Sequence, residues 1–184
     1  MEITTTILII VGVLILWVIG TFNALVKLRN RTREAWADID VQLKRRYDLI
    51  PNLLETVKGY AAHERGLFEK VAEARSRAMG AKSPKERGEA ENALSSTLKT
   101  LFAVAENYPQ LRASENFLEL QRELRDTEDK IQAARRFYNS NVRDINIKIE
   151  SFPANLVANL FNFKKMELFE LAEVTEREAP QVKF

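Results

Sequence analysis

Residues 44–54 read KRRYDLIPNLL and stand in the middle of a long run of helix-forming sequence. The stretch places Arg46 on an otherwise apolar helical stripe and inserts Pro51 five residues later. Proline lacks the backbone N–H group, and its ring crowds the carbonyl group four residues earlier, which here belongs to Tyr47. Whether a helix ends here or continues past Pro51 therefore decides the topology of the domain.

Two topologies are open. If Asp48 caps a new helix and Pro51 lies in its first turn, the helices span 22–47, 49–79, 84–107 and 110–150. Four comparable helices with short connections form an antiparallel up-down bundle, which is the fold we expect. If the helix continues through Pro51 with a kink, the domain is instead one long helical hairpin centred near Lys82.

The composition favours an all-α fold in both cases. Only six glycines and five prolines interrupt 184 residues that are rich in helix formers. There is no cysteine, which excludes disulfides and thiolate metal sites. The 28 basic and 26 acidic residues give a net charge of +2, too small for a nucleic-acid-binding protein.

The amino-terminal residues 3–26 read ITTTILIIVGVLILWVIGTFNALV and carry no charge. At about 1.5 Å per residue, this helix is long enough to cross roughly 30 Å of hydrocarbon. A cleaved signal peptide has a basic start and a shorter apolar centre, whereas here Glu2 precedes the run. We therefore predict a retained transmembrane helix, with residues 1–26 as the anchor.

The flanks of this run predict its orientation. Four cations follow the run, and one acidic side chain precedes it, so the positive-inside bias places the amino terminus outside and the main domain in the cytoplasm. The cations either contact anionic headgroups as well or only set the topology. We expect the following residues at the membrane interface: Trp17, Phe22, Lys27, Arg29, Arg31 and Arg33.

The span is expected to continue into the domain as one helix, because no glycine or proline lies between Gly20 and Pro51. Arg46 and Glu64 interrupt the apolar stripe; we expect solvated positions at its rim, with pairing to a neighbouring helix as the alternative. The stripe consists of Trp36, Ile39, Leu43, Ile50, Leu53, Val57, Tyr60, Leu67 and Val71.

Later signals divide the rest of the chain. Ser83, Pro84 and Glu86 form a capping box that begins a helix, and the sequence NYP at 107–109 ends it. A long final element stops at the sequence SFP, 151–153. We therefore expect a helical bundle domain over 27–163 and an amphipathic, then extended, carboxy-terminal tail over 164–184.

Three long strings resemble the LemA family of bacterial membrane proteins. They are AWADIDVQLKRRYDLIPNLLETVKGYAAHE (35–64), NYPQLRASENFLELQRELRDTEDKIQAARRFYN (107–139) and FPANLVANLFNF (152–163). The resemblance implies an antiparallel helical bundle with an amino-terminal anchor and a cytoplasmic body. It implies no defined activity, and the functional hints of the family concern membrane organisation, including relatives linked to magnetosome membrane formation.

One residue departs from the family pattern. Asn162 stands where the family more often has glycine. Asparagine is the next residue best able to adopt the left-handed conformation that ends a helix, so we expect a helix stop here.

The residues themselves do not predict catalysis. A carboxylate-bridged di-metal bundle needs two Glu-x-x-His pairs, but the chain has one histidine, His63, which does not form the zinc motif His-Glu-x-x-His either. There is no glycine-rich phosphate loop. We therefore predict no catalytic, metal or cofactor residues, no small-molecule substrate and no nucleic-acid partner.

Residues near the carboxy-terminal end form a candidate interaction surface. Asparagines there either belong to an interface or polar network or lie at helix caps. The amphipathic segment after Pro153 either seals the bundle, lies on the membrane or enters a neighbouring subunit. The candidates are Asn139, Asn141, Asn146, Phe161, Phe163, Phe169, Val182 and Phe184.

These observations predict a non-enzymatic scaffold of the bacterial inner membrane that self-associates through heptad-like helix faces and organises membrane or recruits partners. The partners expected are the lipid bilayer, further copies of the chain and a second membrane protein. The alternative is a monomeric adaptor that regulates a membrane enzyme such as a protease.

Overall fold

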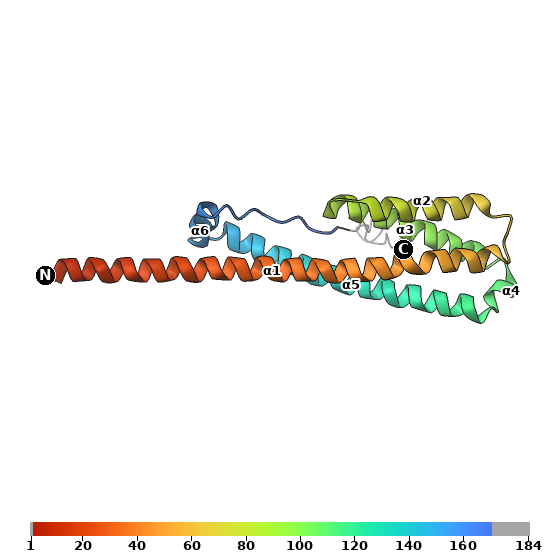
Figure 1. Ribbon diagram of the computed structural model, residues 1–184, viewed down its shortest axis with the longest axis horizontal. Coiled ribbons are helices and arrows are strands. Elements are labelled where there is room, and N and C mark those ends of the chain that lie inside the picture. Colours follow the sequence, from red (N-terminus) through yellow and green to blue (C-terminus); the bar gives the residue numbers. More distant parts are fainter. Residues whose placement is uncertain (1, 171–184) are drawn as a thin grey trace, which may run out of the picture. The chain divides into compact units, whose positions relative to one another are not determined.

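The structure, a computed structural model, describes residues 2–170; in this range it is helical and without strands, which confirms the all-α prediction (Figure 1). The chain divides into two compact units, one of residues 1–40 and 133–167 and the other of residues 41–132 and 168 onward. α1 and α5 each contribute to both units. The helices are α1 (Glu2–Lys58), α2 (Arg65–Gly80), α3 (Pro84–Ala105), α4 (Pro109–Arg112), α5 (Glu115–Glu150) and α6 (Ala154–Leu160).

α1 passes through Pro51 and ends at Lys58. The predicted start of a new helix after Asp48 is therefore wrong. The long hairpin centred near Lys82 is also wrong, because α1 stops before the turn at Gly59. The backbone N–H groups of Tyr60 and Ala61 both donate to the carbonyl of Val57, at 3.0 and 2.9 Å, and thereby close the end of the helix.

A side chain from another helix explains how α1 tolerates Pro51. The proline has no N–H group for the carbonyl of Tyr47. Arg75 of α2 supplies the missing donor, because its Nε donates to that carbonyl at 2.8 Å. The Tyr47 carbonyl is partly buried, and the bond from Arg75 satisfies it, so the helix continues.

The second unit is a four-helix bundle made of the last part of α1, then α2, α3 and the first part of α5. Successive helices run in opposite directions, as the up-down prediction requires (Figure 1). α2 packs against α3. The predicted capping box is confirmed, since the Ser83 side chain accepts from the Glu86 N–H and the Glu86 side chain accepts from the Ser83 N–H.

The final long element begins later than predicted. Residues 109–112 form the single turn α4, and α5 begins only at Glu115. Leu111 of α4 is fully buried, and Phe117 of α5 packs against Phe102 of α3 with ring centroids 6.1 Å apart. The chain reverses direction here around these buried apolar side chains. The turn α4 therefore ends before α5 begins.

The first unit combines the remaining parts of α1 and α5 with α6. Its core joins Leu25 of α1 to Ile145 and Ile149 of α5 and to Val157 and Ala158 of α6. The apolar segment after Pro153 therefore seals this unit with one face. Phe163, which follows α6, completes the buried cluster.

The predicted helix stop at Asn162 is confirmed. Asn162 has a φ of 55°, in the left-handed region. Its N–H donates to the carbonyl of Asn159 at 3.2 Å, and the N–H of Phe163 donates to that of Ala158 at 2.9 Å. These two bonds form a Schellman motif, in which an αL residue lets the chain reverse and satisfies the last carbonyls of the helix.

The chain after α6 is extended and tied down by side chains. The Asn146 amide bonds twice with the backbone of Met166, its Nδ2 donating to the carbonyl and its Oδ1 accepting from the N–H, both at 2.9 Å. Tyr138 donates to the carbonyl of Glu167 at 2.8 Å. Burial, together with the Glu167 carboxylate, raises the pKa of Tyr138 to about 12, so this donor keeps its proton at neutral pH.

In the second unit, the backbone of Glu170 lies directly on α3. A Cβ atom at Gly88 would overlap the Glu170 carbonyl oxygen, far inside contact distance. The neighbouring Phe169 is fully buried. Part of the predicted tail, residues 164–170, thus belongs to the folded body, whereas residues 171–184 lie outside the described residues.

The Pro51 site generates the first prediction. Replacing Arg75 with alanine should cost about 1–2 kcal/mol, because the carbonyl of Tyr47 then loses a charged donor. In a Pro51→Ala background the alanine N–H serves that carbonyl, so the same replacement should cost much less. Urea denaturation of the four proteins in mild detergent measures this coupling, with Arg77→Ala, an exposed arginine of α2, as the control. Equal costs in both backgrounds would contradict the explanation.

The close approach at Gly88 generates the second prediction. Gly88→Ala should lower stability by about 1–3 kcal/mol, since the added methyl group displaces the backbone of Glu170. Gly66→Ala, where nothing lies within 4 Å of the added carbon, should raise stability by up to about 1 kcal/mol through helix propensity. Thermal denaturation compares the two, and limited proteolysis should cut the Gly88 variant faster near residue 170. A Gly88 variant as stable as the Gly66 variant would show that the segment is not docked there.

Candidate functional site

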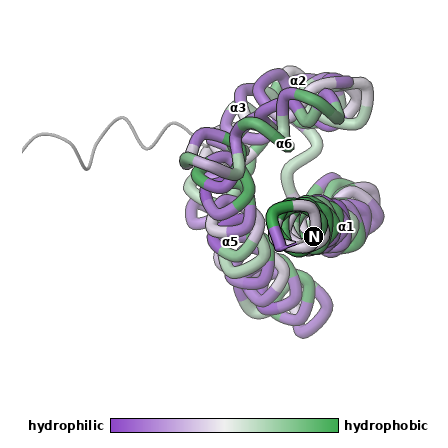
Figure 2. The backbone as a smooth tube through the Cα atoms, turned by 90° about the vertical axis from the view of Figure 1, so that its left-hand side faces the viewer, coloured by the Kyte–Doolittle hydropathy of each residue, from purple (hydrophilic) through white to green (hydrophobic). Residues whose placement is uncertain are grey.

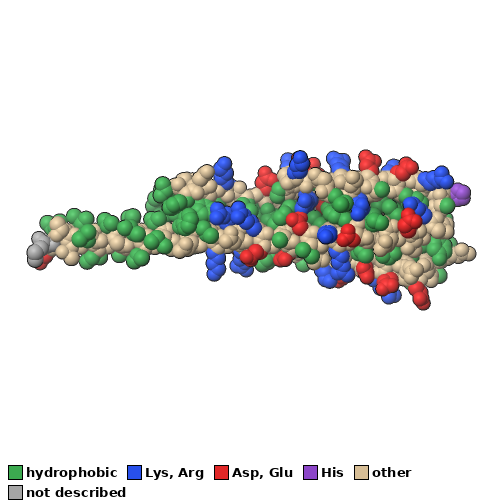
Figure 3. Space-filling view, in the orientation of Figure 1, with side chains coloured by type: hydrophobic (Ala, Val, Ile, Leu, Met, Phe, Trp, Pro, Cys, Tyr) green, Lys and Arg blue, Asp and Glu red, His purple; other side chains and the backbone are tan. Residues whose placement is uncertain are grey.

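α1 contains one segment that is long and apolar enough to cross a membrane. None of its most apolar 18-residue window is buried inside the protein. Figures 2 and 3 show this hydrophobic run on the amino-terminal part of α1. Trp17 is exposed on it, as expected for a residue that faces lipid or the interface. These features support membrane anchoring of the chain.

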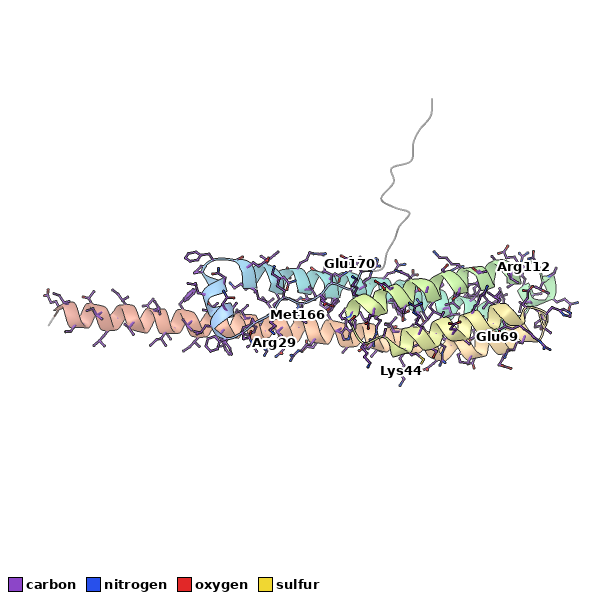
Figure 4. The ribbon with its side chains drawn as sticks, turned by 90° about the horizontal axis from the view of Figure 1, so that it is seen from above. Arg29, Lys44, Glu69, Arg112, Met166 and Glu170 are labelled. Atoms are coloured by element: carbon purple, nitrogen blue, oxygen red, sulfur yellow. The ribbon has the colours of Figure 1, made fainter. Side chains whose placement is uncertain are left out.

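An aromatic cluster stands where this run ends. Phe22 packs against Phe161 and Phe163, with ring centroids 4.7 and 5.8 Å apart. Arg29 lies on the part of α1 beside α6 (Figure 4), and its guanidinium is over the Phe163 ring, 5.1 Å from the ring centroid. We call these four residues the juxtamembrane collar. The collar brings together two predicted membrane-interface residues, Phe22 and Arg29, and two residues of the predicted interaction surface.

The other predicted interface cations occupy different surroundings. Lys27, Arg31 and Arg33 are exposed. Arg31 stacks on the ring of Phe137 at 5.6 Å, a cation–π contact within the first unit. The first cation, Lys27, directly follows the apolar run, so a charged band succeeds the run along α1.

The predicted interaction residues do not form one surface. Asn141 is buried and donates to the carbonyl of Phe137 in its own helix, and Asn146 holds Met166 as described above. Asn139 is half-buried and belongs to α5. Phe169 is buried, which removes it from any free surface. Val182 and Phe184 lie outside the described residues.

The second unit contains a buried ion cluster around Arg46. Arg46 has a side chain only 2% exposed, so the expected solvated position at the rim is wrong. Its Nη1 lies 2.5 Å from Glu128 Oε2 of α5, and its Nη2 lies 2.9 Å from Glu91 Oε2 of α3. Nη2 also donates to Ser95 Oγ at 3.1 Å. The alternative, pairing with neighbouring helices, is the correct one.

Tyr47 extends this cluster, because its hydroxyl donates to Glu91 Oε1. Burial raises the pKa of Glu91 above its ordinary value of 4.5; Arg46 and the Tyr47 hydroxyl oppose this shift but do not cancel it. Burial and the nearby Glu91 carboxylate also raise the pKa of Tyr47 well above its usual range. The phenol therefore remains a donor.

This cluster is suited to fixing helix register rather than to chemistry on a substrate. Its main members, Arg46 and Glu91, are enclosed and form an ion pair with each other, and Arg46 also forms one with Glu128. A buried charge that loses its partner is strongly destabilising, so wrong pairings of the helices are excluded. The sequence signal was present, since Arg46 lies on the apolar stripe of α1.

The second unit also has a surface groove of about 490 Å³ between the end of α1 and α2. Its lining is mainly apolar and also includes three charged side chains. Among the described residues, no group of three or more His, Cys, Asp and Glu side chains is arranged to hold a metal ion. The groove lining is Leu54, Lys58, Ala62, Arg65, Phe68, Glu69 and Ala72.

Together, the fold and the collar define an all-α protein in which one candidate membrane span and a bundle helix are the same helix. The sequence profile described as the LemA family matches residues 35–184. The chain belongs to the LemA family. The resemblance found in the sequence is thereby confirmed.

Curated relatives agree with this assignment. Protein LemA of Metamycoplasma hominis is 27% identical over 168 residues, which cover 89% of this chain and 75% of that protein. Magnetosome protein MamQ 2 of Paramagnetospirillum magneticum is 23% identical over 81% of this chain and 64% of its own length. Magnetosome protein MamQ of Magnetospirillum gryphiswaldense is 22% identical over 80% and 64%. The chain thus spans less than two thirds of both MamQ proteins.

The Glu91 site generates a prediction of pH dependence. Because folding raises the pKa of Glu91, its protonation favours the folded state. That contribution is complete below about pH 4.5, the ordinary value, and is lost as the pH rises through the folded-state pKa. The stability of the wild type relative to Glu91→Gln should therefore be greater near pH 5 than near pH 8. Urea denaturation of both proteins at several pH values measures this difference in stability. A difference that does not change with pH would contradict the raised pKa of Glu91.

Proposed function

We propose that the chain is a non-enzymatic scaffold that is anchored in the bacterial inner membrane and self-associates. The observation that carries the proposal is the continuity of α1, in which an uncharged, unburied run passes without a break into a helix of the bundle. The name of the MamQ relatives, magnetosome protein, supports a role at a membrane-bounded structure. The LemA and MamQ names describe no enzyme activity.

The orientation follows from charge. The cations that follow the run favour the cytoplasmic side, which places the amino terminus outside and the bundle in the cytoplasm. Apolar side chains that remain exposed on the long helix α5 support self-association. In the first unit these include Phe137 and Ile147 on α5.

Self-association is tested by the particle mass of the full-length protein in native-like lipid discs, measured by mass photometry. After the mass of an empty disc is subtracted, the wild type should give at least twice its 21.2 kDa chain mass. The double variant Phe137→Ser/Ile147→Ser should shift the mass toward one copy, since it removes exposed apolar contacts. Arg136→Ser/Arg143→Ser, at exposed polar positions of the same helix, should retain the wild-type mass. A wild-type particle that contains one copy of the chain would overturn the scaffold proposal.

The second candidate is a monomeric adaptor that binds a membrane enzyme such as a protease. The groove between α1 and α2 favours it, because an open and mainly apolar lining that includes charged side chains suits a partner helix. One copy per particle, together with a single membrane partner captured by crosslinking at Ala72, would support the adaptor.

A further inference from the structure

α6 and its two flanking turns expose apolar side chains that the core of the first unit does not use. One face of α6 is buried through Ala154, Val157 and Ala158. Phe152 on the chain before it is 80% exposed, and Leu160 at its end is 74% exposed. Leu156 and Phe161 are exposed as well. We call Phe152, Leu156, Leu160 and Phe161 the elbow face.

The position of α6 along α1 determines what covers this face. The cluster that α6 joins includes Val18, Phe22, Leu25, Val26 and Leu28 of α1. The uncharged run covers residues 3–26, about 36 Å of helix, and the hydrocarbon core is about 30 Å thick. A span that begins near Ile3 therefore leaves the hydrocarbon near Phe22. α6 packs across that boundary.

Positively charged side chains lie on both sides of the elbow face, as expected in the headgroup region of a membrane. Lys27 is exposed on α1 directly after the run, and Lys164 is exposed directly after the collar. Arg29 keeps its guanidinium over Phe163. Hydrophobic side chains gather beside the run and the first Lys and Arg side chains stand next to them (Figure 3). Apolar side chains backed by cations are typical of helices that lie in an anionic membrane interface.

We propose that the elbow face inserts into the boundary between headgroups and acyl chains of the leaflet in which the uncharged run of α1 ends. The inference rests on the membrane anchoring proposed above and adds a second membrane contact to it. A single helix is free to rotate about its axis and to tilt. A second contact from α6 fixes the rotation of α1, and with it the face of the first unit that is turned to the membrane.

The absence of cysteine allows a direct test with the full-length protein. Single cysteines are introduced by Leu160→Cys and Phe152→Cys and labelled with the environment-sensitive fluorophore NBD. The protein is placed in vesicles of equal parts phosphatidylcholine and phosphatidylglycerol. Leu14→Cys, within the span, is the lipid-exposed reference. Ser140→Cys is the aqueous reference, exposed on α5 and nine residues, about 13 Å, before Ile149 of the core.

The fluorescence emission of the labels at positions 160 and 152 should be blue-shifted, as at position 14. Spin-labelled lipid should quench these three labels strongly. Iodide in the buffer should quench only the label at position 140. Labels at 160 and 152 that respond to iodide like position 140 would overturn the proposal. Labels at 160 and 152 that neither lipid nor iodide quenches would also overturn the proposal, because a second copy of the chain would then cover the elbow face. The label at position 14 distinguishes failure of this proposal from failure of the proposed membrane anchoring. If spin-labelled lipid does not quench that label, the membrane anchoring is wrong.

Discussion

The buried charge of Arg46 is the constraint on which the second unit depends. A guanidinium with 2% exposure is stable there only while Glu91 of α3 and Glu128 of α5 remain in contact with it. Three helices must therefore meet at one level. Apolar packing tolerates sliding between helices, whereas an ion cluster of this kind permits one register.

The same part of α1 is tied to the remaining helix through the backbone. Pro51 frees the carbonyl of Tyr47, and Arg75 of α2 occupies it. Within six residues, α1 thus contacts α2, α3 and α5 through polar groups. Elsewhere the bundle is held mainly by apolar side chains such as Leu94 and Leu101. Specificity is concentrated in the segment 46–51, which is also where the sequence departs from an ideal amphipathic helix.

The first unit follows a different logic. It has few helices, and it closes its core with α6 and with an extended segment held by Asn146 and Tyr138. Side-chain amides and hydroxyls replace the strand partners that an extended backbone normally needs. The core of this unit lies at the end of the apolar run, so its packing and the proposed membrane contact share the same residues of α1.

The sequence by itself determined the features that depend on local composition and local hydrogen bonding. The uncharged run, the capping box at Ser83, the helix stop at Asn162 and the all-α class are properties of short segments and their neighbours. Only the tertiary structure decided that α1 continues through Pro51 and that Arg46 is buried in an ion cluster. The donor for the Tyr47 carbonyl lies 28 residues further along the chain, and the carboxylates for Arg46 lie 45 and 82 residues away. Periodicity records which face of a helix is apolar, but it does not record which distant side chain meets a proline-freed carbonyl or a buried charge.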